Sequence, residues 1–176
     1  MRHLLGASAV VVLLAASPEA QAALRFDAPA GWIAGKPASA MRVAEFTLPK
    51  TATDPEDASL IVYYFGGTGG SVQANLDRWI GQMRQPDGRD SKTVAKSSSL
   101  ASKARLKITL IDIPGTYVAE VTPGSSERFN KPGFRQLAAV VETGAGPYFV
   151  KLVGPAATVA RWEASVRAFL ASLRLQ

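Results

Sequence analysis

The stretch 60–80, LIVYYFGGTGGSVQANLDRWI, joins two segments of different periodicity across a run of glycines. Residues 60–65 are β-branched or aromatic without a break, which is typical of a central strand. The glycines at 66–70 turn the chain, and Ser71 is a residue type that caps the N-terminus of a helix. This stretch therefore predicts a strand, a turn and a helix.

The predicted helix has one apolar side. Its apolar residues recur at helical spacing, at Val72, Leu76, Trp79, Ile80 and Met83. The opposite side is expected to carry the polar residues Gln73, Asn75, Asp77 and Arg78. Gly81 is expected inside the helix, which would end at Pro86-Asp87-Gly88. Such a helix can cover a sheet with its apolar side.

Strand patterns lie on both sides of this unit. Residues 41–48 alternate between apolar and polar, 103–120 reads as two strands around Pro114-Gly115, and 134–143 with 148–153 predict a hairpin. A second helix is expected to begin near Pro155, with an apolar face made of Val159, Trp162, Val166, Phe169, Leu170 and Leu173. The helices are too few for alternating βα units. The order therefore predicts an α+β fold with a largely antiparallel sheet.

The N-terminal residues 1–22 have the features of a secretory signal peptide. A basic head precedes the uncharged run 4–16, which is shorter than the about 20 apolar residues that span a bilayer. Small residues at 20 and 22 predict cleavage after Ala22. Ser17 stands where a bacterial lipoprotein would have its cysteine, so no lipid anchor is expected. We predict a single domain at 23–176, periplasmic or secreted, with no transmembrane segment.

The composition excludes several kinds of chemistry. The chain has a net charge of +6, no cysteine and a single histidine, His3, which lies within the predicted signal peptide. A mature chain without imidazole or thiol has no Ser-His-Asp or Cys-His catalysis and essentially no zinc site. The acidic loops 54–57 and 87–90 do not match the ligand spacing of an EF-hand. We therefore expect no cofactor and no metal.

Two patterns leave other interpretations open. A carboxylate pair could run glycoside hydrolysis, and the candidates are Asp112, Glu120 and Glu142. The loop from Gly66 to Gly70 precedes a helix, whose N-terminus can bind anions. It lacks the lysine of a P-loop, so a flexible turn is the favoured interpretation.

The positive charge is concentrated in one stretch, which carries Lys92, Lys96, Lys103, Arg105 and Lys107. Lys103, Arg105 and Lys107 alternate with apolar residues, which predicts three cations on one face of a strand. Such a face can dock on an anionic surface or an acidic protein, or it can simply be solvated. Nucleic acid is not expected as a partner of an exported protein with few aromatic residues in this stretch.

Three segments resemble one known family. They are Phe26-x-x-Pro29-x-Gly31-Trp32, VYYFGGTGGSVQANLDRW at 62–79, and GPYFVKLVGPAATV at 146–159. The chain resembles the PsbP-like superfamily, and its exported bacterial members most of all. That superfamily includes a photosystem II subunit and a Ran-binding nuclear import factor. The resemblance implies an α/β/α sandwich, a central antiparallel sheet flanked by two main helices, and a non-catalytic role. It carries over no site residue.

The function expected from these observations is that of an exported, non-catalytic accessory or binding protein. Its partner is an unknown protein or anionic surface, docked on the basic face. The alternative is a small-ligand-binding protein or a carboxylate-dependent hydrolase with its site near the loop from Gly66 to Gly70. A flat basic face would favour the first, and an enclosed cavity lined by two carboxylates the second.

Overall fold

The structure is a computed structural model that describes residues 23–176. The predicted signal peptide, with His3 and Ser17, lies outside the described residues. Export, the cleavage site and the lack of a lipid anchor therefore stay predictions. Within 23–176, no helix is both long enough and apolar enough to cross a membrane.

The centre of the molecule is an eight-stranded sheet in which every neighbouring pair is antiparallel. Its order is β2-β3-β4-β9-β8-β7-β5, and β6 also pairs with β7. The strands are β2 (Ile33–Gly35), β3 (Arg42–Leu48), β4 (Ala58–Tyr64), β5 (Met83–Arg84), β6 (Lys96–Ala101), β7 (Lys107–Tyr117), β8 (Lys131–Val141) and β9 (Tyr148–Pro155). A separate two-stranded ribbon, β1 (Leu24–Arg25) with β10 (Arg174–Leu175), joins the two ends of the described chain.

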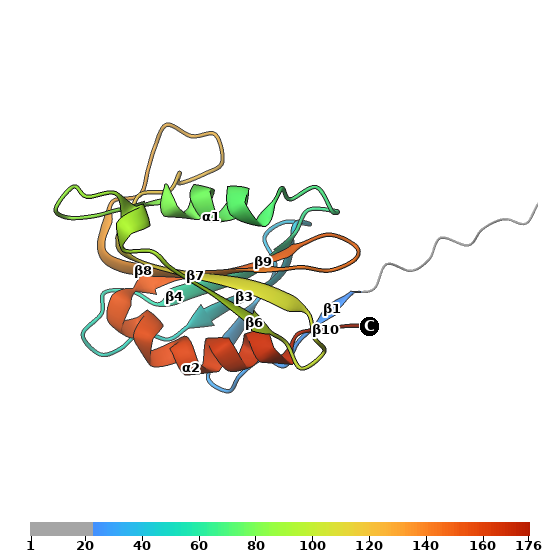
Figure 1. The fold of residues 1–176 in the computed structure, drawn as a ribbon. Coiled ribbons are helices and arrows are strands. Elements are labelled where there is room, and N and C mark those ends of the chain that lie inside the picture. The colour runs from blue at the N-terminus through green and yellow to red at the C-terminus, as the bar shows by residue number, and fades with distance from the viewer. Residues whose placement is uncertain (1–22) are drawn as a thin grey trace, which may run out of the picture.

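Two α-helices lie on opposite faces of the sheet (Figure 1). The long helix α2 (Ala156–Ser172) packs on β8 and β9, and the nine-residue helix α1 (Val72–Ile80) packs on β7 and β8. A short 3-10 helix, η1 (Ser91–Thr93), follows β5. The predicted α+β class and the antiparallel sheet are confirmed. The sheet dominates the fold, because α1 covers only part of its own face.

The larger core lies between the sheet and α2. Phe169 and Leu170 of α2 are fully buried there against strand residues such as Leu60, Leu137 and Leu152. The smaller core, around Trp79 and Phe149, lies under α1. The predicted apolar face of the second helix is confirmed, with Trp162 half-buried at its edge.

The first helix differs from its prediction at both its end and its polar side. It ends at Ile80 with Gly81 as C-cap, so Met83 lies in β5. Ser71 is the N-cap, and its hydroxyl accepts a hydrogen bond from the Ala74 backbone N–H. Asn75, expected to face solvent, is buried because its amide donates to the carbonyls of Gly69 and Ser71 and holds the preceding turn.

The region 103–120 also differs from its prediction. One continuous strand, β7, runs through Pro114-Gly115, where two strands were expected. Pro114 pairs with β8, but its backbone faces the other edge of β7, where its carbonyl accepts a hydrogen bond from Gln85 Nε2. At that edge β6 pairs only up to Asp112 and β5 only from Thr116, so no strand there needs the missing N–H. The six-residue strand β6, which is mostly polar, was not predicted.

Candidate functional site

A groove of about 800 Å³ opens on the face of the sheet that α1 covers incompletely. Because α1 packs on β7 and β8, the neighbouring strands β4 and β9 form an open floor. Ile61 and Tyr63 of β4 lie in this floor beside Lys151 of β9. The walls are formed by the end of α1 and by the loop 118–130, which rises above α1 in Figure 1. The groove is therefore a consequence of the shortness of α1.

Half-buried aromatic rings line the groove in two stacked pairs. The rings of Tyr63 and Phe65 are 5.9 Å apart and inclined by 10°. The rings of Tyr117 and Phe129 are 5.6 Å apart and inclined by 24°. Flat aromatic surfaces of this kind can hold the apolar body of a ligand.

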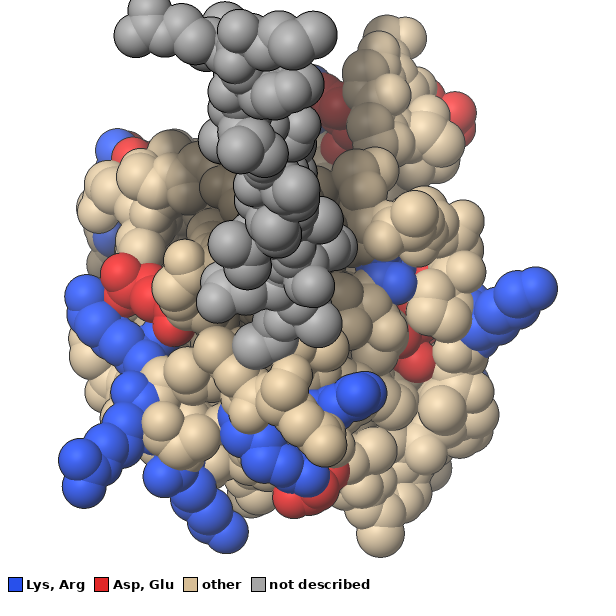
Figure 2. All heavy atoms as spheres, turned by 90° about the vertical axis from the view of Figure 1, so that its right-hand side faces the viewer, with Lys and Arg blue, Asp and Glu red and all other residues tan. Residues whose placement is uncertain are grey.

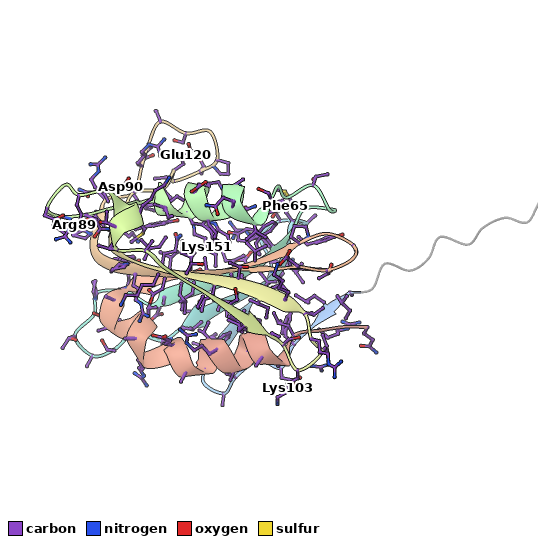
Figure 3. All side chains as sticks on the ribbon, in the orientation of Figure 1. Phe65, Arg89, Asp90, Lys103, Glu120 and Lys151 are labelled. Carbon is purple, nitrogen blue, oxygen red and sulfur yellow. The ribbon has the colours of Figure 1, made fainter. Side chains whose placement is uncertain are left out.

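Lys151 is the central polar group of the groove (Figure 3). Its Nζ donates hydrogen bonds to Gln82 Oε1 at 2.6 Å and to Tyr117 Oη at 3.1 Å. It also lies 5.1 Å from the centre of the Tyr117 ring. An ammonium group has three N–H donors, so the third remains for a ligand.

The environment of Lys151 disfavours its charged form. Burial lowers the pKa of Lys151 from its usual 10.5 to about 7, and the nearby Arg78 guanidinium adds to this effect. Burial also raises the pKa of Tyr117 to about 12 and raises that of Tyr63. Both phenols therefore stay protonated at neutral pH, and neither can neutralise the lysine.

The other cations of the groove are mostly paired with carboxylates. Lys131 binds Glu56 at 2.6 Å. Arg128 binds Glu120 at 3.4 Å, and Arg42 binds Glu45 at 3.1 Å. Among residues 23–176, Lys151 and Arg78 are the groove cations that form no ion pair with a carboxylate. Arg78 instead binds the side-chain oxygen of Asn75. Two like charges thus face the groove without a counter-ion from this part of the chain.

The predicted basic face is not present as a face. Lys103 and Arg105 lie in the turn between β6 and β7, and Arg105 has a left-handed backbone with φ of 64°. Lys107 begins β7 and pairs with Glu142 at 2.9 Å, and Lys92 of η1 lies 3.7 Å from Asp77. The expected alternation of three cations is therefore wrong, because a turn occupies 102–106. Figure 2 shows the end of the molecule on the right of Figure 1, where Lys and Arg side chains are scattered among tan and acidic surface.

The candidate carboxylates of a hydrolase are held apart. Asp112 binds Arg135 beside α2, Glu120 binds Arg128 in the loop above the groove, and Glu142 binds Lys107 beyond the end of β8. Each is paired with a different cation, so the structure does not bring two of them together.

The acidic loops have structural partners as well. Asp54 accepts hydrogen bonds from the backbone N–H and the hydroxyl of Thr158 in the first turn of α2. Asp90 is the N-cap of η1, and Asp87 binds Arg89. Within 23–176, no three acidic side chains are grouped so that they could hold a metal ion.

The loop from Gly66 to Gly70 does not line the groove, although its neighbour Phe65 does. Its glycines let it approach the hairpin turn 144–147. A Cβ on Gly146, whose φ is 109°, would lie 2.4 Å from Gly67 Cα. A side chain on Gly69 would collide with the Phe149 ring. Close packing therefore explains this glycine run.

Lys151 was not among the residues that the sequence singled out. Its signal was present, because β9 reads YFVKLVGP and has one charge in an apolar run. At a period of two, Lys151 shares a face with Phe149 and Val153. A lysine in the middle of a central strand is unusual enough to be a candidate by itself.

No family model and no curated protein matches this chain. Solved structures similar to this chain are found. The solution structure of PsbP from Synechocystis sp. PCC 6803 covers 93% of this chain and 99% of its own, at 13% identity and a TM-score of 0.46. The Pseudomonas aeruginosa protein of unknown function PA94 covers 75% of this chain and 81% of its own, at 13% identity and a TM-score of 0.49.

One of these two structures bears the name of the family that the sequence resembles. At 13% identity and with TM-scores below 0.5, neither likeness says anything about the site of this chain.

Proposed function

We propose that this protein is a binding protein whose groove holds a small anionic ligand with a flat, apolar body. The observation that carries this proposal is Lys151, a desolvated cation inside an aromatic groove, with no carboxylate partner among residues 23–176. An anion placed beside Lys151 and Arg78 would take the free N–H and relieve the repulsion between the two cations. The stacked aromatic pairs would hold the ligand's body.

Of the two functions considered from the sequence, this proposal favours small-ligand binding, at a place other than the glycine loop. It names no catalytic residue. The carboxylates singled out for hydrolysis are paired with cations in separate places. Glu56, Asp57 and Glu120 also line the groove. Glu56 and Glu120 are paired with Lys131 and Arg128, and Asp57 accepts a hydrogen bond from the Lys50 N–H.

The anionic aromatic dye 1-anilinonaphthalene-8-sulfonate is a suitable probe. We expect its fluorescence to rise on binding to the folded protein at pH 6. Lys151→Met should raise the Kd for the dye about ten-fold, which is the contribution expected of one desolvated ion pair. Arg78→Gln, at the exposed rim, should raise it less. Lys103→Met is the matched control, because Lys103 is exposed in the β6–β7 turn, away from the groove. Equal binding by wild type and Lys151→Met would contradict the proposal.

The same titration should depend on pH. Because the free lysine loses its proton around pH 7, dye affinity should fall as pH rises from 6 to 9, by about ten-fold in total, which is the loss expected in Lys151→Met. The fall should be absent in Lys151→Met. A pH profile shared by the variant would assign the effect to another group.

Docking of the basic stretch on an anionic partner stays a separate proposal, now limited to fewer residues. Lys103 is exposed in its turn, whereas Lys107 is already paired with Glu142. If docking occurs, Lys103→Glu should weaken binding to phosphatidylglycerol vesicles at low salt more than Lys107→Glu does. Absence of wild-type binding under these conditions would leave solvation as the role of the stretch.

A further inference from the structure

The groove places an amine, a phenol and an anion site in one desolvated space. Nζ of Lys151 lies 3.1 Å from the Tyr117 hydroxyl, and both groups line the cavity. Arg78 lines the same cavity and is close enough to act on the charge of Lys151. An amine, a proton donor and a cation are the groups that condensation with a carbonyl group of an acidic ligand requires.

We propose that Lys151 binds its ligand covalently, as an imine with an aldehyde or ketone that also carries a carboxylate. The inference rests on the proposed function, since the carboxylate is the anion that Arg78 would bind. It adds that the ligand carries a carbonyl group within reach of Nζ.

The step balances without any other reactant. The lone pair of the neutral Nζ forms a bond to the carbonyl carbon, and the carbonyl π electrons move to oxygen. The carbinolamine then loses its oxygen as water, and both hydrogens of that water derive from Nζ. Tyr117 can give a proton to the departing oxygen and recover one from the nitrogen, so the phenol is unchanged at the end. Nothing is oxidised or reduced.

The surroundings of Nζ support the nucleophilic form. Around it, β7 supplies Tyr117, β4 supplies Tyr63, α1 supplies Arg78, and Gln82 follows α1. These groups are two neutral phenols, an amide and a like charge, and no carboxylate among the described residues pairs with the ammonium. At neutral pH about half of such a lysine is unprotonated, against less than about one part in a thousand of an exposed lysine.

The test uses the whole protein with 4-carboxybenzaldehyde as probe and sodium cyanoborohydride to reduce any imine, at pH 7. Peptide mass spectrometry then compares labelling rates among the lysines of one sample. We expect Lys151 to be labelled at least about ten-fold faster than exposed Lys103 and Lys107. Labelling of Lys151 no faster than these would overturn the proposal, and this comparison needs no variant.

Two variants sharpen the result. Lys151→Arg should lose the fast label and leave the slow ones unchanged. Tyr117→Phe should slow the labelling of Lys151 several-fold relative to that of Lys103 and Lys107 in the same sample, since the phenol moves the protons of the step. Unchanged labelling in Tyr117→Phe would remove Tyr117 from the step. If the wild-type protein binds the dye but is not labelled at Lys151, the proposed function stands and the imine proposal is wrong. If it neither binds the dye nor is labelled, both proposals are wrong.

Discussion

Lys151→Met is expected to make the folded protein more stable while it weakens anion binding about ten-fold. A desolvated ammonium with no carboxylate partner among the described residues destabilises the folded state, and methionine is an apolar side chain of similar length. The drop in pKa from 10.5 to about 7 sets an upper bound of about 5 kcal/mol on this destabilisation. Relaxation of an open groove reduces the gain, so we expect the free energy of unfolding to rise by about 2 kcal/mol at pH 6.

The stability difference between Lys151→Met and the wild type should depend on pH. Because the pKa of Lys151 is lower in the folded state, the unfolded chain binds the additional proton between pH 7 and about 10.5. The wild type should therefore gain stability as pH rises through this window, and below pH 7 the destabilisation is fully present. The advantage of Lys151→Met should be largest at pH 6 and shrink towards pH 9.

Urea unfolding of both proteins at pH 6, 7.5 and 9 measures this difference. At pH 9 and below the raised pKa of Tyr117 contributes little, because the tyrosine of the unfolded chain titrates near pH 10. Lys103→Met, the same change at an exposed site, should be neutral at every pH. A Lys151→Met protein that is less stable than the wild type at pH 6 would show that the hydrogen bonds to Gln82 and Tyr117 outweigh the desolvation.

Arg135→Met is expected to cause the largest loss of stability, about 3–5 kcal/mol. Arg135 on β8 binds Asp112 of β7 through two hydrogen bonds, of 2.7 and 2.6 Å, and Glu163 of α2 at 2.7 Å. Only 16% of its side chain is exposed. The hydrogen bond with Asp112 raises the pKa of Arg135, so the guanidinium always carries its charge. Its removal would leave two half-buried carboxylates facing each other between the sheet and α2.

Arg167→Met is the matched control, because Arg167 binds the same Glu163 at 2.9 Å from an exposed position. It should cost under about 1 kcal/mol. Burial raises the pKa of Glu163, but the bonds to Arg135 and Arg167 outweigh this and hold it below its usual range. Wild-type stability should therefore fall in acid as Glu163 takes up its proton, and urea unfolding from pH 7 to 3 would detect this. Equal losses in the two arginine variants would contradict a special role for Arg135.

Periodicity was enough to predict the elements that bury one clear side. Helix α2 and the hairpin of β8 and β9 agree with their patterns because their apolar residues follow a single period over many positions. The pattern was misleading where a side chain serves a turn. Asn75 reads as a surface residue, yet it is buried because backbone carbonyls need its amide. Strand β6 is polar because it lies at an edge, so no apolar pattern reveals it.

The candidate site was harder to predict than the fold. The cations at 103, 105 and 107 alternate as in a strand, but the left-handed backbone at Arg105 places a turn there. The groove depends on how far α1 reaches across the sheet, which is a tertiary property of a nine-residue helix. The charge of Lys151 in β9 is visible in the sequence. The desolvation of Lys151 is not, because it depends on Gln82 and Tyr117 from distant segments.

The ribbon of β1 and β10 gives the described chain a nearly circular path. The Ala23 N–H donates to the Gln176 carbonyl at 2.9 Å, and the Gln176 N–H donates back to Ala23 at 3.1 Å. A short glycine linker between these ends would replace hydrogen bonds with a covalent join and leave the rest of the path unchanged. New ends could then be opened at exposed Gly124, in the loop that walls the groove. Such a permuted chain would carry any attached reporter at the rim of the groove and not at the far end of the sheet.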